Sequence, residues 1–428
     1  MTAQGGYDVV IAGGGLAGLS LAVALGSAGL AVAAIDRDPP ADLLAAGFDG
    51  RSSAIARGSQ QVLATLGIWQ RLGDQAQAIH DIRVSDARPG RGEGGGSRAS
   101  SLFLHYGDAD LPPGAGPMGY IVENRQLRRA LYEALEALPS VRLLAPATVA
   151  EASPGGGGTA VALADGRRLR TPLLVAADGK RSRLREAAGI AVTRWPYGQA
   201  GIVATLAHER PHHGVAHEHF LPSGPFAILP MVGGEDGAGG VAPHRSSLVW
   251  TERKALVPAV MALDEAAFGR ELERRFGTSL GALRPIGGRW AYDLELMLAQ
   301  RFVAPRLALL GEAAHAIHPI AGQGLNLGLR DVAALAECVV DALRLGLDPG
   351  GEAALAPYER WRRFDTLVLA GVTDALNRLF SNDLAPLRLA RDLGLAAVHR
   401  LPPAKRLFMR HAMGQVGRLP RLARGEAL

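Results

Sequence analysis

The sequence has a single cysteine among its 428 residues, Cys338, so the chain cannot form a disulfide with itself. Such sparse cysteine usage is typical of proteins from a reducing cytoplasm. The sequence also lacks a C-x-x-C pair and an H-E-x-x-H motif, and we expect no metal site. Residues 9–35 carry no charge, but six glycines interrupt this run and no basic segment precedes it. We therefore expect neither an export signal nor a membrane-spanning helix there.

Positive charge is unevenly distributed along the chain. The net charge is +5, yet residues 376–428 alone hold ten Arg or Lys side chains against Asp383, Asp392 and Glu426. Such a basic segment is compatible with an anionic membrane surface, with a protein partner or with a solvated helix face. These cations follow helical patterns without interleaved aromatic residues, and no familiar nucleic-acid-binding motif occurs, so we expect no nucleic-acid partner.

The N-terminal stretch has the pattern of a nucleotide-binding unit. It predicts a strand at 9–11, a G-x-G-x-x-G turn, a helix at 16–25 and a second strand at 31–35. Gly13 would make the turn, Gly15 would let the backbone approach a pyrophosphate, and Gly18 would let the helix pack against the strand. Asp36 closes the second strand 18 residues after Gly18, close to where a ribose-binding carboxylate is expected.

The length predicts two domains or one large domain with an insertion, and a hydrophobic content of 48% allows a sizeable core. We predict an α/β protein with a discontinuous Rossmann-like domain, an inserted, mostly antiparallel β-sheet domain and a helical, basic C-terminal region. The predicted ranges are 1–80, 117–189 and 296–348 for the nucleotide domain, 81–116 and 190–295 for the inserted domain, and 349–428 for the C-terminal region. Predicted helices include 53–66, 124–138, 264–276 and 325–343, and short alternating strands are expected to dominate between 190 and 294.

A second glycine-dense loop, residues 311–324, connects a predicted strand to a predicted helix. Glu312 follows the carboxyl end of the strand, where ligands of open α/β sheets bind. Gly322 and Gly324 flank the start of the helix, whose free N–H groups favour an anion or a polarised ring. The glycines also allow the backbone to approach a flat ligand closely.

Two other pairs of residues can be interpreted in more than one way. Asp178 and Gly179 follow a predicted strand, but such a pair is also an ordinary turn. His315 and His318 are three residues apart and could begin a metal site, but no third ligand is evident in the sequence. Hydrogen-bonded loop histidines or pocket walls are the simpler interpretation of this pair.

Three segments in the same order along the chain resemble the fingerprint of class A flavoprotein aromatic hydroxylases, which are related to para-hydroxybenzoate hydroxylase. They are the N-terminal glycine motif with Asp36, the Asp178-Gly179 turn, and Gly311-Glu312 with A-A-H-x-x-H-P and GQGLNLGLRD. The third segment is also similar to the ubiquinone-biosynthesis branch, the 2-polyprenylphenol hydroxylases. YIVENRQLRRAL (120–131), LFSND (379–383) and AMG (412–414) support the same branch, so the resemblance covers nearly the whole chain.

The resemblance implies that the chain binds FAD. The implied pyrophosphate contacts are Gly13, Gly15, Leu16, Ala17, Gly18, Asp178 and Gly179. Asp36 and Arg37 would lie at the adenosine ribose, Arg51 and Arg125 at the phosphates and ribityl chain, and the Val149 backbone at adenine. The isoalloxazine would be lined by Gly322, Gly324, Leu325 and Asn326. Glu312 would bind the ribityl chain or phosphate; the family usually has Asp here, and we expect the longer Glu to keep the role.

The resemblance also implies the reaction. NADH or NADPH would reduce FAD, O₂ would add to flavin C4a to give a hydroperoxide, and an electron-rich phenol ring would attack its distal oxygen. Water must be excluded from such a site, and the inserted domain would roof it. Candidate pocket walls are Phe220, Phe226, Pro230, Met231 and Pro319, although core packing is the favoured interpretation of each of them taken alone. No residue is assigned as the base, and no second dinucleotide motif occurs, so nicotinamide would bind transiently.

The predicted function is hydroxylation of a polyprenylphenol intermediate of ubiquinone biosynthesis. Two alternatives stay open: a hydroxylase of the same fold for a soluble aromatic or a secondary metabolite, and a non-catalytic flavin-binding or assembly protein. Because a polyprenyl substrate is embedded in lipid, the basic C-terminal region would serve as a membrane-surface helix or dock partner enzymes. We expect a cytoplasmic location, with peripheral attachment to the inner face of the membrane as a further hypothesis.

Overall fold

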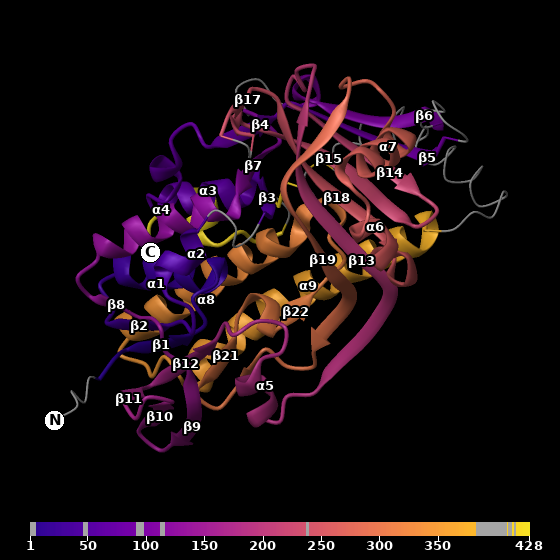
Figure 1. Cartoon of the computed structure of the whole chain (residues 1–428). Coiled ribbons are helices and arrows are strands. Elements are labelled where there is room, and N and C mark those ends of the chain that lie inside the picture. The colour runs from indigo at the N-terminus through magenta and orange to yellow at the C-terminus, as the bar shows by residue number, and fades with distance from the viewer. Residues whose placement is uncertain are drawn as a thin grey trace.

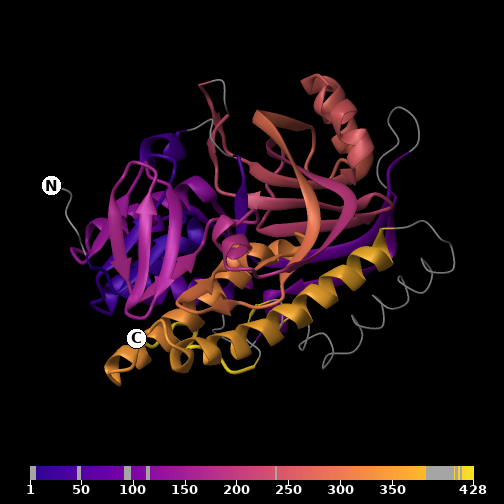
Figure 2. The same ribbon diagram turned by 90° about the horizontal axis from the view of Figure 1, so that it is seen from below.

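The computed structural model describes residues 6–45, 50–90, 98–111, 116–236, 239–381, 409, 413–414 and 417–428 (Figure 1). Two β-sheet regions lie side by side in these parts of the chain, and long helices connect them. Figure 2, seen from below, shows the longest helix running beneath both regions.

The first region is built on a six-stranded sheet with the order β20-β21-β12-β1-β2-β8. Its strands are β1 (Val9–Ala12), β2 (Val32–Ile35), β8 (Val141–Leu144), β12 (Leu173–Ala176), β20 (Val303–Ala304) and β21 (Leu307–Leu309). Strands β1, β2, β12 and β21 run parallel and are buried throughout, as in a parallel sheet covered on both faces. Their carboxyl ends therefore lie at one edge, which brings the loops after β1, β12 and β21 together.

Helices cover one face of this sheet, and a small antiparallel sheet covers the other (Figure 1). Helix α1 (Leu16–Ser27) packs against both α4 (Asn124–Glu136) and α8 (Gln323–Arg344). Because α1 is apolar nearly all round, it is buried from Gly18 to Gly26. The opposite layer consists of β9 (Val149–Gly155), β10 (Gly158–Leu163) and β11 (Arg168–Thr171), whose inward side chains join the same core.

A second three-stranded sheet shows that one local prediction is wrong. Strands β3 (Ser52–Ala56), β7 (Gly119–Glu123) and β4 (Ala76–Ile79) form it in that order. The predicted helix at 53–66 is thus wrong at its start, because α3 begins only at Arg57 (Arg57–Thr65). Residues 52–56 are held extended by antiparallel pairing with β7, a distant segment whose influence local propensity does not contain.

The second region is an eight-stranded sheet with the order β22-β19-β13-β18-β15-β14-β5-β6. Its strands are β5 (Asp81–Arg88), β6 (Arg98–Gly107), β13 (Val192–His208), β14 (Val215–Leu221), β15 (Gly224–Met231), β18 (Arg245–Arg253), β19 (Leu283–Ala299) and β22 (His315–Ala316). All neighbours are antiparallel except β5 and β14, so the mostly antiparallel character is confirmed. Helix α7 (Glu265–Phe276) packs Phe268 and Leu272 against one face, in a separate core. The short β16 (Gly234–Glu235) and β17 (Val241–Ala242) pair beside this sheet.

The expectation that short strands dominate between 190 and 294 misses the length of β13 and β19. Each has 17 residues, and the two pair along nearly their full length. Pro285 and two glycines interrupt the pattern of β19 and hide it in the sequence. The pairing absorbs them through a register shift at Ala204/Thr205, where Gly287 has a φ of 70°.

Helix α9 (Glu352–Phe380) joins the two regions. Near its start the Tyr358 hydroxyl donates to the carbonyl of Leu309 in the parallel sheet, at 2.7 Å. Near its end Asn377 donates to Gln199 of β13, at 3.1 Å. The remaining helices are α2 (Pro40–Leu44), α5 (Arg183–Ala187) and α6 (Val257–Met261). The predicted α/β class, with a parallel sheet, a largely antiparallel second sheet and a helical C-terminal region, is confirmed.

The large sheet draws its strands mainly from the predicted inserted ranges, with the end of β19 and β22 as additions from beyond 295. We keep the predicted domain ranges as a proposed division of the chain. Of the predicted C-terminal region, 382–408 and parts of the LFSND and AMG segments lie outside the described residues. Within the described residues, no helix is both long enough and apolar enough to cross a membrane.

Candidate active site

The turn between β1 and α1 is shaped by three glycines with different tasks. Gly13 has a φ of 117°, and a side chain there would collide with the carbonyl oxygen of Ala177. A side chain at Gly18 would collide with the carbonyl oxygen of Gly13. Gly15, in contrast, faces open space, with no atom within 4 Å of a Cβ built on it. The first and third glycines are thus required by packing. The second leaves an open space, or cradle, in which a ligand can approach the backbone.

The start of α1 is available to an anion. Gly15 is the N-cap residue, and neither a capping side chain nor an acidic residue occupies the first turn. The first backbone N–H groups of a helix have no partner within the helix, and the helix dipole favours negative charge there. A pyrophosphate is the kind of group that such an end binds.

Asp36 closes over the same turn. A side chain added at Gly14 would collide with its carboxylate, and the Asp38 N–H donates to Asp36 Oδ1 at 3.2 Å. Burial raises the pKa of Asp36, while the Asp38 N–H and Arg128 oppose this. The predicted neighbour Arg37 turns outward instead and pairs with Asp38 at 3.0 Å.

Arg128 was missed by the sequence interpretation. It lies on α4, and its Nη1 donates to the carbonyl of Gly14 at 2.8 Å. The only sequence signal was its position one turn after Arg125, a residue that the resemblance did indicate. Arg128 therefore holds the glycine turn from a distant helix and places a positive charge beside Asp36.

The second helix start, at α8, is organised differently. Gly322 is the N-cap in the left-handed region, with a φ of 61°, and no side chain caps the helix. Gly324, like Gly15, has no atom within 4 Å of a Cβ built on it. Asn326 is 1% exposed and fastens this start to β3. Its amide accepts from the Ala56 N–H at 2.9 Å and donates to the Ala54 carbonyl at 2.8 Å.

The side chain of Asn326 also donates to the Gly322 carbonyl at 3.0 Å, so its amide group is fully occupied by the protein backbone. Asn326 was predicted to line a flavin ring. Its side chain instead fixes the turn to β3. The backbone around Gly322 and Gly324, together with the half-buried Leu325, is left to face a ligand.

The two helix starts meet at Ala17. A Cβ built on Gly311 would lie 3.5 Å from the Ala17 side chain, and one built on Gly328 of α8 would lie 3.6 Å from it. Glu312 follows Gly311 in a short 3₁₀ turn, and its side chain is exposed. The carboxylate predicted to bind the ribityl chain or phosphate thus stands at the sheet edge between α1 and α8.

A buried charge cluster supports α8 from behind. Asp331 is fully buried, and its carboxylate contacts His315 Nε2 at 2.6 Å, Arg362 Nε at 2.7 Å and the Gly311 N–H at 3.2 Å. Burial alone would raise the pKa of Asp331, but the charges and hydrogen bonds of His315 and Arg362 lower it. His315 is therefore an anchor of the Gly311 turn. Within the described residues, no three His, Cys, Asp or Glu side chains form a group that could hold a metal ion.

His318 has a different environment from His315. It is 1% exposed and packs edge-on against Tyr197, with ring centroids 5.2 Å apart. Burial lowers the pKa of His318 to about 4, against the opposing charge of Asp374. Neither ring nitrogen has a hydrogen-bond partner among the described residues. The imidazole is consequently neutral at physiological pH.

The five predicted pocket walls do not form one surface. Phe220 stacks on Phe380 with ring centroids 4.2 Å apart and packs with Ile320, two residues before Gly322. Phe226 instead packs against Trp250 on the face of the sheet that α7 covers. Met231 joins a third cluster with Met118 and Ile121, Pro230 is buried beside it on β15, and Pro319 adjoins Ile320. Only Phe220 and Pro319 lie next to the α8 start.

The other predicted contacts are spread over the turn after β12, the start of β3, helix α4 and strand β9. The Asp178 carboxylate accepts from the Arg183 N–H at 3.0 Å and so caps α5, while Gly179 has a φ of 84°. Arg51 places its guanidinium over the Tyr292 ring at 5.1 Å. Arg125 lies 3.9 Å from Glu123, and Val149 begins β9 opposite Leu163.

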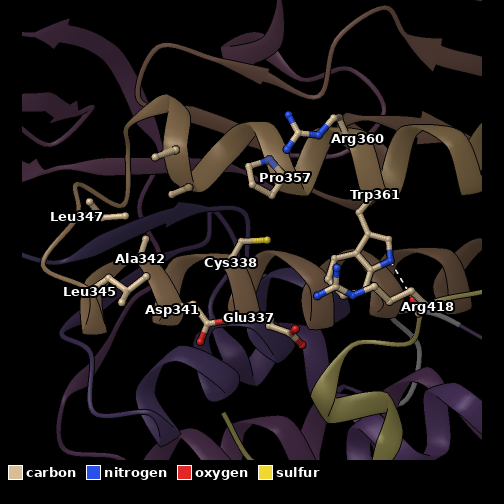
Figure 3. Close-up of a pocket in the computed structure, with 12 residues that line it drawn as sticks. Glu337, Cys338, Asp341, Ala342, Leu345, Leu347, Pro357, Arg360, Trp361 and Arg418 are labelled. Carbon is tan, nitrogen blue, oxygen red and sulfur yellow. Dashed lines mark hydrogen bonds between the residues drawn. The ribbon is translucent and has the colours of Figure 1, made fainter.

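A cavity of about 470 Å³ lies between α8 and α9, away from both glycine turns (Figure 3). It is lined by Cys338, Trp361 and Arg418 among others, and by none of the predicted site residues. Burial raises the pKa of the Cys338 thiol to about 11, so this cysteine is unreactive at neutral pH. The cavity is therefore separate from the candidate active site.

Comparison with known proteins gives consistent results. The family described as "FAD binding domain" matches residues 6–364. The ubiquinone hydroxylase UbiL of Rhodospirillum rubrum is 54% identical over 98% of this chain and 93% of its own. The 3-demethoxyubiquinol 3-hydroxylase of Escherichia coli is 33% identical over 95% of this chain and 98% of its own. The structure of p-nitrophenol 4-monooxygenase PnpA from Pseudomonas putida superposes with a TM-score of 0.78 at 19% identity, over 97% of this chain and all of that one.

Proposed function

The chain belongs to the FAD-binding-domain family and is a flavin-dependent aromatic monooxygenase, and from this premise we propose that it hydroxylates a polyprenylated phenol of ubiquinone biosynthesis. NADH or NADPH would be the electron donor and O₂ the co-substrate. The observation that carries the proposal is the 54% identity, over nearly the whole chain, to a relative named as a ubiquinone hydroxylase. The two glycine turns, which leave open space at Gly15 and Gly324, are consistent with the same proposal.

FAD fits the donor set at the two helix starts. We propose that the open cradle at Gly15, with Leu16, Ala17 and the uncapped start of α1, binds the pyrophosphate. Asp36 would accept from the adenosine ribose hydroxyls, since its carboxylate lies over the same turn. Glu312, exposed at the adjoining sheet edge, would accept from the ribityl hydroxyls.

The flat ring of the flavin would lie against the start of α8. Gly324 offers open space there, and the backbone N–H groups of this helix start have no side-chain cap. When bound, FAD supplies the redox and oxygen chemistry of the reaction. The chain's own tasks are to orient the ring, to position the phenol and to exclude water. Phe220, Ile320 and Phe380 form an apolar wall suited to the last task.

The proposed location is the cytoplasmic side of a membrane, because the proposed substrate carries a lipid tail. The basic segment 376–428 was the predicted attachment, but six of its ten Arg and Lys residues lie outside the described residues. Of the other four, Arg378, Arg421 and Arg424 are paired with carboxylates, and Arg418 lies over Trp361. The described part of 376–428 therefore offers little free positive charge.

The purified protein tests the proposal directly. It should be yellow, oxidise NADH or NADPH in the presence of a short-chain polyprenylphenol, and give a product heavier by one oxygen atom in mass spectrometry. Quinone intermediates in a strain lacking the protein should include the unhydroxylated precursor. A flavin-loaded protein that never oxidises the nicotinamide with any phenol would favour the non-catalytic alternative.

A further inference from the structure

Helix α9 exposes an apolar row along its outer side. Phe364, Val368 and Val372 follow one another at intervals of four residues and are 72%, 43% and 45% exposed. Leu367 lies beside them and is 47% exposed. Residues four apart lie on one helix face, so these side chains form a continuous stripe. Isolated exposed apolar residues need no explanation, but a contiguous group of this kind indicates a binding surface.

The stripe continues into an aromatic and basic margin. Trp195 of β13 is 52% exposed, and the guanidinium of Arg378 lies over its ring at 4.8 Å, at the end of α9. At the other end Arg360 precedes Phe364 by one helical turn, and Arg363 stands next to it; both arginines are exposed. Aromatic rings and arginines around an aliphatic centre are the composition of a surface that enters a lipid headgroup layer.

Two carboxylates beside the stripe, Asp365 and Asp374, are already paired with arginines. Asp365 contacts Arg362 at 2.6 Å and Arg330 at 3.4 Å. Asp374 contacts Arg378 at 2.8 Å. The positive charge of the margin therefore comes from the exposed Arg360 and Arg363, and it favours an anionic surface. A second copy of the chain would bring like-charged margins together, which opposes self-association.

The C-terminal end of α9 packs beside the proposed active site. Phe380 stacks on Phe220, and Leu376 packs in the same cluster with Ile320, next to the start of α8. Helix α9 thus runs from the exposed stripe to the apolar wall beside the flavin-binding turn. In Figure 2 it lies along the lower part of the picture, below the large sheet.

We propose that the α9 stripe (Phe364, Leu367, Val368 and Val372), with Trp195 and Arg360 at its margin, is the contact of this enzyme with an anionic lipid surface. The inference rests on the proposed function, because a polyprenylated phenol is dissolved in lipid and must enter from there. The helix lies in the plane of the interface rather than across it, in keeping with the absence of a spanning helix among the described residues.

Vesicle sedimentation of the full-length, FAD-loaded protein tests the proposal. We expect the wild type to sediment with phosphatidylcholine vesicles that contain phosphatidylglycerol, and less with phosphatidylcholine alone. Phe364→Glu and Val368→Glu should each lower the vesicle-bound fraction at least about tenfold. Leu345→Glu is the matched control, because Leu345 is 74% exposed at the end of α8 but lies outside the stripe. This control should sediment like the wild type.

FAD content and turnover of a short-chain, water-soluble phenol separate this inference from the proposed function. Both should stay unchanged in Phe364→Glu. Wild-type levels of vesicle binding by Phe364→Glu and Val368→Glu, or equal loss in Leu345→Glu, would overturn the lipid contact. Light scattering that shows a dimer dissociated by Phe364→Glu, without vesicle binding by the wild type, would overturn it in favour of self-association. Stripe-dependent vesicle binding without hydroxylation of any phenol would support the lipid contact and reject the proposed function.

Discussion

The two helix starts of the candidate site differ in what holds them. At α1 the glycines themselves decide the geometry, because side chains at Gly13 and Gly18 would collide with backbone carbonyls. At α8 a side chain does the holding: Asn326 ties the turn to β3, and the buried Asp331 carboxylate fixes the Gly311 turn behind it. The first start is encoded locally, whereas the second depends on partners far away in the sequence.

Within the α1 turn, substitutions at Gly15 and at Gly13 should differ most in their effects on FAD binding and folding. Gly15→Val should abolish FAD binding and leave the protein folded, because the new side chain fills the cradle without striking the protein. Gly13→Val should disrupt folding as well. Flavin absorbance and circular dichroism of the purified variants check this. Gly157→Val, which also points into open space but lies in the β9–β10 turn, should keep its flavin.

Substitution of Asp331, in the buried charge cluster behind α8, should have the next largest effect, on the free energy of unfolding. Asp331→Ala leaves Arg362 and His315 buried without their carboxylate, which should cost about 3–5 kcal/mol of unfolding free energy. Urea denaturation measures this cost. Asp365→Ala removes a carboxylate that is 35% exposed and should cost about 1 kcal/mol or less. Equal destabilisation by the two variants would contradict a special role for the buried cluster.

His318 should couple the stability of the protein to pH. Burial lowers the pKa of His318 to about 4, whereas the unfolded chain takes up its proton near pH 6.5. Its contribution is fully present above pH 6.5 and is lost as the pH falls towards 4, by about 3 kcal/mol in all. Urea midpoints between pH 7 and pH 5 should therefore fall less steeply in His318→Gln. An unchanged slope would mean that His318 is hydrated in the folded protein.

Asn326→Ala tests whether the α8 start needs its tie to β3. The substitution leaves the Ala56 N–H and the Ala54 carbonyl without their partner, at a cost of about 1–3 kcal/mol. FAD affinity should fall along with stability, because the turn loses its fixed geometry. Asn326→Asp keeps the acceptor for Ala56 but aims a buried carboxylate at the carbonyls of Ala54 and Gly322, so it should be at least as destabilising as Asn326→Ala. Thermal melts and flavin fluorescence titrations distinguish the three proteins.

Substitutions of Glu312 should have the smallest effect, a modest change in FAD affinity. Glu312→Ala should weaken FAD binding by about tenfold, or ~1.4 kcal/mol, because one charged acceptor is lost. Glu312→Asp should stay within a factor of about three of the wild type, since the carboxylate is exposed and has room to adjust. A Glu312→Asp variant as weak as Glu312→Ala would show that the extra methylene is required in this chain.

Sequence reasoning succeeded where the signal is local. The β1–turn–α1–β2 unit and the helices α4, α7 and α8 follow from hydrophobic spacing and glycine placement within one segment. It failed where a distant partner decides the conformation. The start of α3 was mispredicted because β7 pairs with residues 52–56, and the length of β19 was hidden by glycines that a register shift accommodates.

The same division applies to the candidate site. Glycines and acids at strand ends were visible in the sequence, but the holding roles of Arg128, Asn326 and Asp331 were not, because their distant partners are 16 to 272 residues away. Phe226 was grouped with Phe220 although neighbouring strands place them on opposite faces of the sheet. Alternation along a strand predicts two faces but does not tell which of them faces the ligand.

The central claim is that both helix starts hold one FAD molecule, α1 at its pyrophosphate and α8 at its flat ring. Binding of ADP and of FAD to Gly15→Val and Gly324→Val tests this most directly, because ADP has the pyrophosphate but not the flavin ring. The account predicts that Gly15→Val loses both ligands, whereas Gly324→Val loses FAD and keeps ADP. Wild-type affinity of Gly324→Val for FAD, or of Gly15→Val for ADP, would contradict it.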